Sequence, residues 1–163
     1  MHHGLARKQP AAGARAAQPR ADRVGAARGA RGVGLIYLDT CLVIYAFEND
    51  PVFGTRTRAA LAASPTQQFA VSPLVKFECL VSPMRSANLV LQQHYEEGLG
   101  QFVLLPATEE VFLRGAALRA RFGLKTPDAL HLAAAQIHGC DELWTNDDRL
   151  AAAAGRLTRN IFA

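Results

Sequence analysis

Short apolar runs alternate with longer segments of helical character along the chain, and this alternation constrains the fold more than any other feature. The runs cover residues 35–38, 68–71, 102–105 and 143–145. Each has the length and apolar content of a buried strand. Because strands that alternate with helices pair in parallel through crossover connections, we predict an α/β fold with a short, mostly parallel central sheet of about four to five strands.

The segments between the runs carry helix signals. Ser72-Pro73 and Thr126-Pro127 each place a polar residue just before or at a helix start and a proline in its first turn. Gly139 follows the last of these patterns as a helix stop. We therefore expect helices over residues 42–47, 54–63, from 73 past 78, 87–97, from 109, 126–138 and 147–154.

The basic charge of the chain lies in its first 34 residues. The sequence pI is about 9.3, but residues 1–34 hold seven basic and one acidic residue, whereas residues 35–163 hold eleven basic and thirteen acidic residues. The first segment is rich in Ala and Gly and poor in large apolar residues, so it cannot bury enough surface to fold. We predict a disordered basic leader over 1–34, able to touch RNA phosphates, and a folded domain over 35–163. A targeting peptide and an upstream misassignment of the start codon are the alternatives.

Cysteine usage and hydropathy indicate the compartment. Cys41, Cys79 and Cys140 stand singly in or beside apolar segments, which favours buried thiols in a reducing cytoplasm and argues against zinc. No run of eighteen apolar residues occurs, so we expect no membrane span.

Three aspartates stand where ligands gather in a parallel sheet. Asp39 ends the first predicted strand, Asp147 follows the fourth, and Asp128 lies in the first turn of a helix. Each also has an ordinary explanation, since Asp39 could cap a helix and the other two could complement helix dipoles.

Glu78 is harder to explain as a surface residue. Its neighbours at helical spacing are mostly apolar, and Lys76 projects elsewhere. A carboxylate on such a stripe is partly desolvated, so it needs a cation. A divalent metal shared with the other acids would serve, and so would a distant arginine.

Four segments in this order resemble the PIN-domain family, and within it the VapC-type toxin ribonucleases of toxin–antitoxin pairs. The segments are LDT at 38–40, SPLV at 72–75 leading to Glu78, TPDALHLAAA at 126–135 and TND at 145–147. The resemblance covers about residues 35–163. It implies a three-layer α/β/α fold and a metal-dependent endoribonuclease that leaves a 5′-phosphate and a 3′-hydroxyl on RNA.

The same resemblance implies roles for individual residues. Asp39, Glu78, Asp128 and Asp147 match the family's acidic quartet that binds Mg²⁺ or Mn²⁺, with Asp39 and Asp128 as the main ligands. Asp148 stands beside the fourth acid, and the family's spacing favours Asp147.

Other polar residues flank these acids. Thr40 and Asn146 would support the acidic residues, and Lys125 and Arg149 could hold RNA phosphates. His131 follows Asp128 by one turn; we expect a packed core histidine rather than a substrate contact.

The resemblance also implies partners: an RNA substrate, a cognate antitoxin protein and a second copy of the chain in a homodimer. Two alternatives stay open. One is a PIN nuclease of RNA processing that has no antitoxin, and the other is a catalytically silent PIN-like binding module.

Overall fold

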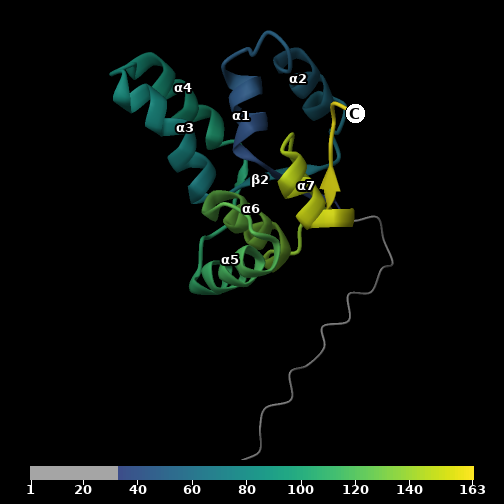
Figure 1. Cartoon of the computed structure of the whole chain (residues 1–163). Coiled ribbons are helices and arrows are strands. Elements are labelled where there is room, and N and C mark those ends of the chain that lie inside the picture. Colours follow the sequence, from purple (N-terminus) through teal and green to yellow (C-terminus); the bar gives the residue numbers. More distant parts are fainter. Residues whose placement is uncertain (1–32) are drawn as a thin grey trace, which may run out of the picture. The chain divides into compact units, whose positions relative to one another are not determined.

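A computed structural model describes residues 33–163, in which five strands form one sheet (Figure 1). The sheet order is β3-β2-β1-β4-β5, and every neighbouring pair is parallel. The strands are β1 (Leu35–Leu38), β2 (Gln68–Val71), β3 (Val103–Leu104), β4 (Glu142–Trp144) and β5 (Thr158–Arg159). The predicted parallel α/β sheet is therefore confirmed. The sequence did not indicate β5, because Thr158 and Arg159 are polar and do not belong to an apolar run.

Seven α-helices of the described chain connect or follow these strands. They are α1 (Thr40–Phe47), α2 (Gly54–Ala62), α3 (Pro73–Arg85), α4 (Leu89–Leu99), α5 (Glu109–Phe122), α6 (Thr126–Ile137) and α7 (Asp148–Ala154). Each lies within about two residues of its expected start. The proline in the first turn of α3 and of α6 behaves as expected for a helix beginning, since its missing N–H would have had no intrahelical partner.

The direction of the crossovers produces three layers. The chain moves from β1 through β2 to the edge strand β3, then returns past β1 to β4 and β5. Parallel crossovers are right-handed, so reversing the direction moves the helices to the other face of the sheet. Helices α1 to α4 therefore cover one face and α5 to α7 the other, and in Figure 1 α1 to α4 lie in the upper part of the view and α5 and α6 in the lower part. The predicted three-layer α/β/α arrangement follows.

The strand β1 lies in the middle of the sheet and sets the position of the site. Tyr37 lies opposite Ala70 of β2 and Leu143 of β4. The N–H of Asp39, the residue just after β1, donates to the Trp144 carbonyl at 3.0 Å. Helix α1 leaves β1 toward one face and α7 leaves β4 toward the other, so the carboxyl ends of these two strands form the switch point at which open parallel sheets bind ligands.

The core lies on both faces of β1 and β4. Tyr37 and Trp144 are both fully buried, as expected for core aromatics. The other largest fully buried side chains are Tyr95, Leu38, Leu42, Leu132, Leu143, Leu150, His131, Val43, Val71 and Val75. These side chains hold the strands and helices that carry the predicted site.

Residues 1–32 of the predicted leader lie outside the described residues. No helix within residues 33–163 has both the length and the apolar character needed to cross a bilayer.

Candidate active site

A pocket of about 340 Å³ opens at the carboxyl ends of β1 and β4. It brings together all four acids of the predicted quartet, although they come from four separate segments of the chain. The residues that line it are Asp39, Thr40, Cys41, Ile44, Tyr45, Glu78, Asp128, His131, Asn146 and Asp147.

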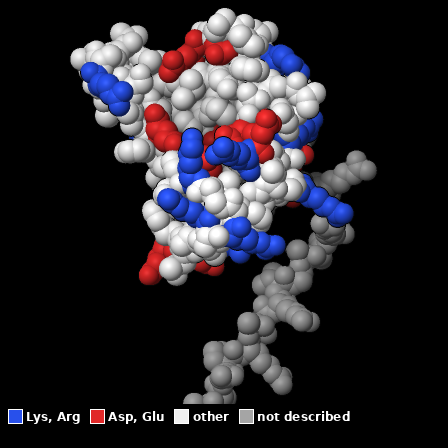
Figure 2. All heavy atoms as spheres, viewed as in Figure 1, with Lys and Arg blue, Asp and Glu red and all other residues white. Residues whose placement is uncertain are grey.

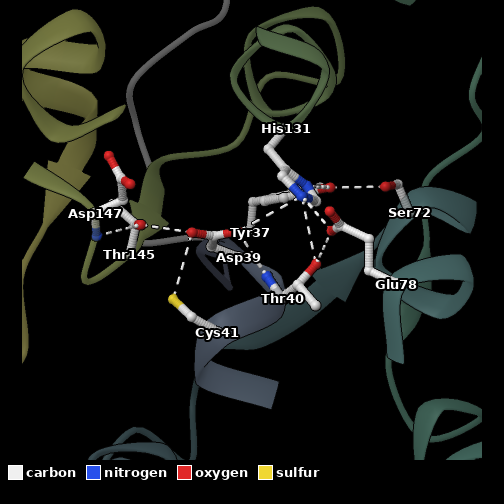
Figure 3. Close-up of polar contacts among 9 residues, drawn as sticks. All are labelled: Tyr37, Asp39, Thr40, Cys41, Ser72, Glu78, His131, Thr145 and Asp147. Carbon is white, nitrogen blue, oxygen red and sulfur yellow. Dashed lines mark hydrogen bonds and ion pairs between the residues drawn. The ribbon is translucent and has the colours of Figure 1, made fainter. Parts of the chain in front are cut away.

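Asp39 stands at the tip of β1 and is almost fully buried, with 8 % of its surface exposed. Its Oδ1 accepts a 2.7 Å hydrogen bond from the Thr40 N–H, so it caps α1 as the sequence allowed. Its Oδ2 accepts from the Thr145 hydroxyl at 2.6 Å and from the Cys41 thiol at 3.4 Å. Capping a helix and facing the pocket are thus compatible functions of this carboxylate (Figure 3).

Glu78 reaches the pocket from α3, and its carboxylate is held by two donors. Oε2 accepts from the Thr40 hydroxyl and from Nε2 of His131, the latter at 2.9 Å. Burial opposes ionisation, but the hydrogen bonds from His131 and Thr40 outweigh it, and the pKa of Glu78 lies below its usual value. Within the described chain no arginine or lysine forms an ion pair with Glu78. The distant-arginine alternative is therefore wrong, and a histidine is the protein's own partner for this acid.

Asp128 and Asp147 enter the pocket from the first turn of α6 and from the N-cap of α7. Asp147 caps its helix through a 2.8 Å hydrogen bond from the Leu150 N–H to Oδ1. The pKa of Asp128 is raised, first by burial and then by the negative charges of Asp147 and Asp39. Asp39 and Asp147 therefore both lie close enough to Asp128 to repel its charge.

Thr145 is a site residue that the sequence did not single out. Its hydroxyl donates to Asp39 Oδ2 and accepts a 3.0 Å hydrogen bond from the Asp147 N–H. One side chain at the end of β4 therefore orders the acids that follow both β1 and β4. In the sequence, Thr145 could have been identified from its position at the start of the TND segment, directly before Asn146 and Asp147.

His131 is buried as expected, but it belongs to the acid cluster. Its Nε2 lies 2.9 Å from Glu78 Oε2 and 3.5 Å from Asp39 Oδ1, and its Nδ1 lies 2.9 Å from the Tyr37 hydroxyl. The expectation of an ordinary packed histidine was incomplete for this reason. The signal that could have found it is its position three residues after Asp128, on the same face of α6.

The remaining predicted residues divide into two groups. Thr40 and Asn146 line the acidic pocket, where Thr40 contacts Glu78 and the Asn146 amide lies 3.4 Å from the Tyr45 hydroxyl. Lys125, Asp148 and Arg149 are exposed and do not line it. The positive charge of Lys125 nevertheless acts on Asp128, whose pKa it lowers against the larger raising effects.

Arg149 instead borders a neighbouring cavity of about 400 Å³ between the end of α5 and α7. Figure 2 shows acidic side chains gathered at the centre of the visible face, with lysine and arginine side chains beside and over them. Some of the basic side chains of the folded part therefore lie beside the acidic centre of this face.

The donor chemistry of the pocket fits a hard divalent cation. Four carboxylates supply oxygen ligands of the kind that Mg²⁺ and Mn²⁺ prefer, and Cys41 keeps its proton because burial and Asp39 raise its pKa to about 12. In residues 33–163 no three acidic, histidine or cysteine side chains are already gathered as a ligand set. A cation bound here would therefore require the carboxylate side chains to rotate toward it.

Comparison with known proteins agrees with this architecture. The family model of the PIN domain matches residues 36–156, whereas no curated protein sequence matches the chain. A chain of a toxin–antitoxin complex from Klebsiella pneumoniae is 27 % identical with a TM-score of 0.65, and the match covers 77 % of this chain and 97 % of that one.

Two more distant structures share the fold. VapBC2 from Rickettsia felis, bound to a DNA fragment from its promoter, matches with 17 % identity and a TM-score of 0.63, over 77 % of this chain and 98 % of that one. VapC20 from Mycobacterium tuberculosis, a toxin that cleaves the sarcin–ricin loop, matches with 15 % identity and a TM-score of 0.63, over 72 % and 94 %. The family model spans most of the chain, including strands β2, β3 and β4 and every residue that lines the acidic pocket, and the chain belongs to the PIN domain family.

Proposed function

We propose that this chain is a Mg²⁺- or Mn²⁺-dependent endoribonuclease and the toxin of a type II toxin–antitoxin pair. One observation carries the proposal: Asp39, Glu78, Asp128 and Asp147 line a single pocket at the switch point of a PIN-domain sheet. A silent binding module would have no need to hold Asp128 beside the like charges of Asp39 and Asp147.

The acids have separate parts in this proposal. Asp39, Asp128 and Asp147 would hold the metal, and Glu78 would complete its ligands or orient a water. A bound Mg²⁺ or Mn²⁺ supplies the positive charge that activates the attacking water and stabilises the leaving oxygen. The protein's contribution is to fix these carboxylates, as Thr145 does for Asp39.

An RNA substrate would need positive charge close to the acidic pocket. The acidic pocket repels an RNA backbone unless cations offset its charge, so Lys125 and Arg149 on the rim would contact phosphates on either side of the scissile bond.

The partner proposal rests on the structural relatives. The Klebsiella pneumoniae neighbour comes from a toxin–antitoxin complex, and the Mycobacterium tuberculosis neighbour is named as an RNA-cleaving toxin. By analogy this chain would bind a cognate antitoxin, form a homodimer and act in the cytoplasm. Exposed apolar side chains at the start of α4, Leu89 and Val90, offer one surface for such a contact.

The test is cleavage of total RNA by the purified chain with Mn²⁺, compared with the same reaction in EDTA. We expect 5′-phosphate ends only where Mn²⁺ is present and the wild-type acids are intact. Asp128→Asn should abolish cleavage, whereas Asp141→Asn, an aspartate at the opposite end of β4, should not. Cleavage that persists in EDTA, or that survives Asp128→Asn, would refute the proposal. Rescue of growth by a co-expressed neighbouring small open reading frame would separate a toxin from an RNA-processing nuclease.

A further inference from the structure

A series of hydrogen bonds between largely buried side chains links Ser72, just before α3, to Tyr37 of β1, then to His131 of α6 and finally to Glu78 of α3. The Ser72 and Tyr37 hydroxyls lie 2.7 Å apart, the Tyr37 hydroxyl lies 2.9 Å from His131 Nδ1, and His131 Nε2 lies 2.9 Å from Glu78 Oε2. Figure 3 shows these side chains pointing toward one another from β1, α3 and α6. Ser72, Tyr37 and His131 are all buried.

Glu78, the last residue of this series, determines which atom is the donor in each hydrogen bond. An ionised carboxylate only accepts hydrogen bonds, so Nε2 of His131 must carry the proton that it shares with Glu78. In a neutral imidazole the other nitrogen is then an acceptor, and it accepts from the Tyr37 hydroxyl. Tyr37 can in turn accept from Ser72. In this arrangement no buried side-chain nitrogen or oxygen of the described residues lacks a partner.

We propose that His131 is a positioning residue for Glu78, and that Tyr37, held by Ser72, keeps His131 in the tautomer that donates to this carboxylate. The inference rests on the proposed function, because Glu78 is taken as a metal ligand or water-orienting group. It adds an assignment for His131, Tyr37 and Ser72, three residues outside the predicted acidic quartet.

The physical need for such support lies in Glu78 itself. Its side chain has several rotatable bonds, extends from a helix surface and is about a quarter exposed, at 26 %. Without donors it would turn toward water. Tyr37, by contrast, lies in the central strand and has no exposed surface, so its hydroxyl is held in a fixed position. A ligand carboxylate held through a histidine by the sheet is pre-organised for the cation.

The first test compares four variants. His131→Ala removes the donor, His131→Gln keeps an amide N–H near the place of Nε2, and Tyr37→Phe removes only the hydroxyl. His138→Gln is the matched control, because His138 lies at the end of the same helix and bonds the Pro106 carbonyl instead. Each variant is assayed for kcat, for KM toward RNA and for Mn²⁺ affinity by calorimetry.

We expect His131→Ala to lower kcat and Mn²⁺ affinity by about 10- to 100-fold, the usual cost of losing a group that orients a metal ligand. KM for RNA should change little, because His131 is only 1 % exposed and offers RNA almost no surface. His131→Gln should recover part of the loss, Tyr37→Phe should show a smaller fall of the same kind, and His138→Gln should match the wild type. Wild-type kcat and Mn²⁺ affinity in both His131→Ala and Tyr37→Phe would overturn the proposal.

The second test needs neither metal nor RNA. The ¹⁵N resonances of the His131 ring in the metal-free protein should show a protonated Nε2 and an unprotonated Nδ1, and Tyr37→Phe should perturb the Nδ1 signal. A proton on Nδ1 of the wild-type protein would refute the tautomer assignment. If His131→Ala does not fold, His131→Gln and Tyr37→Phe decide the outcome. If the wild type shows this tautomer but cleaves no RNA, the proposed function fails while the hydrogen-bond assignment stands.

Discussion

The hydroxyl of Thr145 donates a 2.6 Å hydrogen bond to Oδ2 of Asp39 and thereby joins the carboxyl end of β4 to that of β1. Both residues are buried, and the same hydroxyl accepts from the N–H of Asp147. A single neutral side chain therefore sets the spacing of two acids of the pocket. This relationship makes Thr145 the most direct test of how the fold supports the site.

Replacing Thr145 with valine should lower the free energy of unfolding by about 1–3 kcal/mol. The change keeps the shape of the side chain but leaves a buried carboxylate oxygen and a backbone N–H with one partner fewer. Thr145→Ser keeps the hydroxyl and should lower the free energy of unfolding much less. Urea denaturation measures both variants, and equal stability of the two would show that the hydroxyl does not support Asp39. RNA cleavage should follow the same order.

Neutralising Asp147 should abolish metal-dependent cleavage, whereas neutralising Asp148 should leave it close to the wild-type rate. Asp147 lines the pocket and lies near enough to raise the pKa of Asp128, while the exposed Asp148 does not line it. Asp147→Asn and Asp148→Asn differ by one position in the same helix turn, so each controls for the other. The check is the cleavage rate together with the rise in Tm on adding Mn²⁺, which should vanish only in Asp147→Asn. The opposite pattern would assign the fourth acid to Asp148.

Asp128→Asn should stabilise the metal-free fold at neutral pH. The folded-state pKa of Asp128 is raised above its ordinary value, so ionisation destabilises the folded state relative to the unfolded chain. This penalty is absent below the ordinary carboxyl pKa, grows as pH rises through the interval between the two pKa values, and is complete above the raised one.

Thermal melts in EDTA at a series of pH values measure this effect. The gain in Tm of Asp128→Asn over the wild type should be present at neutral pH and disappear in acid. A variant less stable than the wild type at neutral pH would contradict the repulsion among Asp39, Asp128 and Asp147.

Removing residues 1–33 should preserve both folding and cleavage. Strand β1 begins at Leu35, whose N–H donates to Asp141 Oδ2 at 2.8 Å, so the first contact of the sheet lies beyond the cut. All of the chain's excess positive charge is removed with the leader, yet Lys125 and Arg149 remain on the rim of the site. Circular dichroism and the RNA assay at several salt concentrations check the result. Loss of cleavage with an intact fold would assign RNA binding to the leader.

Most of the fold could be predicted from the sequence because its signals are local. The apolar run at residues 35–38 and the prolines that open α3 and α6 mark elements through their own composition and spacing. The four acids were also accessible, since strand ends and helix starts gather at one edge of a parallel sheet. Strand β5 left no such signal, because its residues Thr158 and Arg159 are polar.

The sequence by itself thus determined the alternation of strands and helices, the parallel sheet and the acids at its edge, because periodicity and capping are properties of neighbouring residues. Only the tertiary structure decided which groups hold those acids. Thr145 meets Asp39 across 106 positions, and His131 meets Glu78 across 53, because sheet order and helix packing bring them together. Contacts over such separations depend on the whole arrangement of layers, which no local pattern encodes.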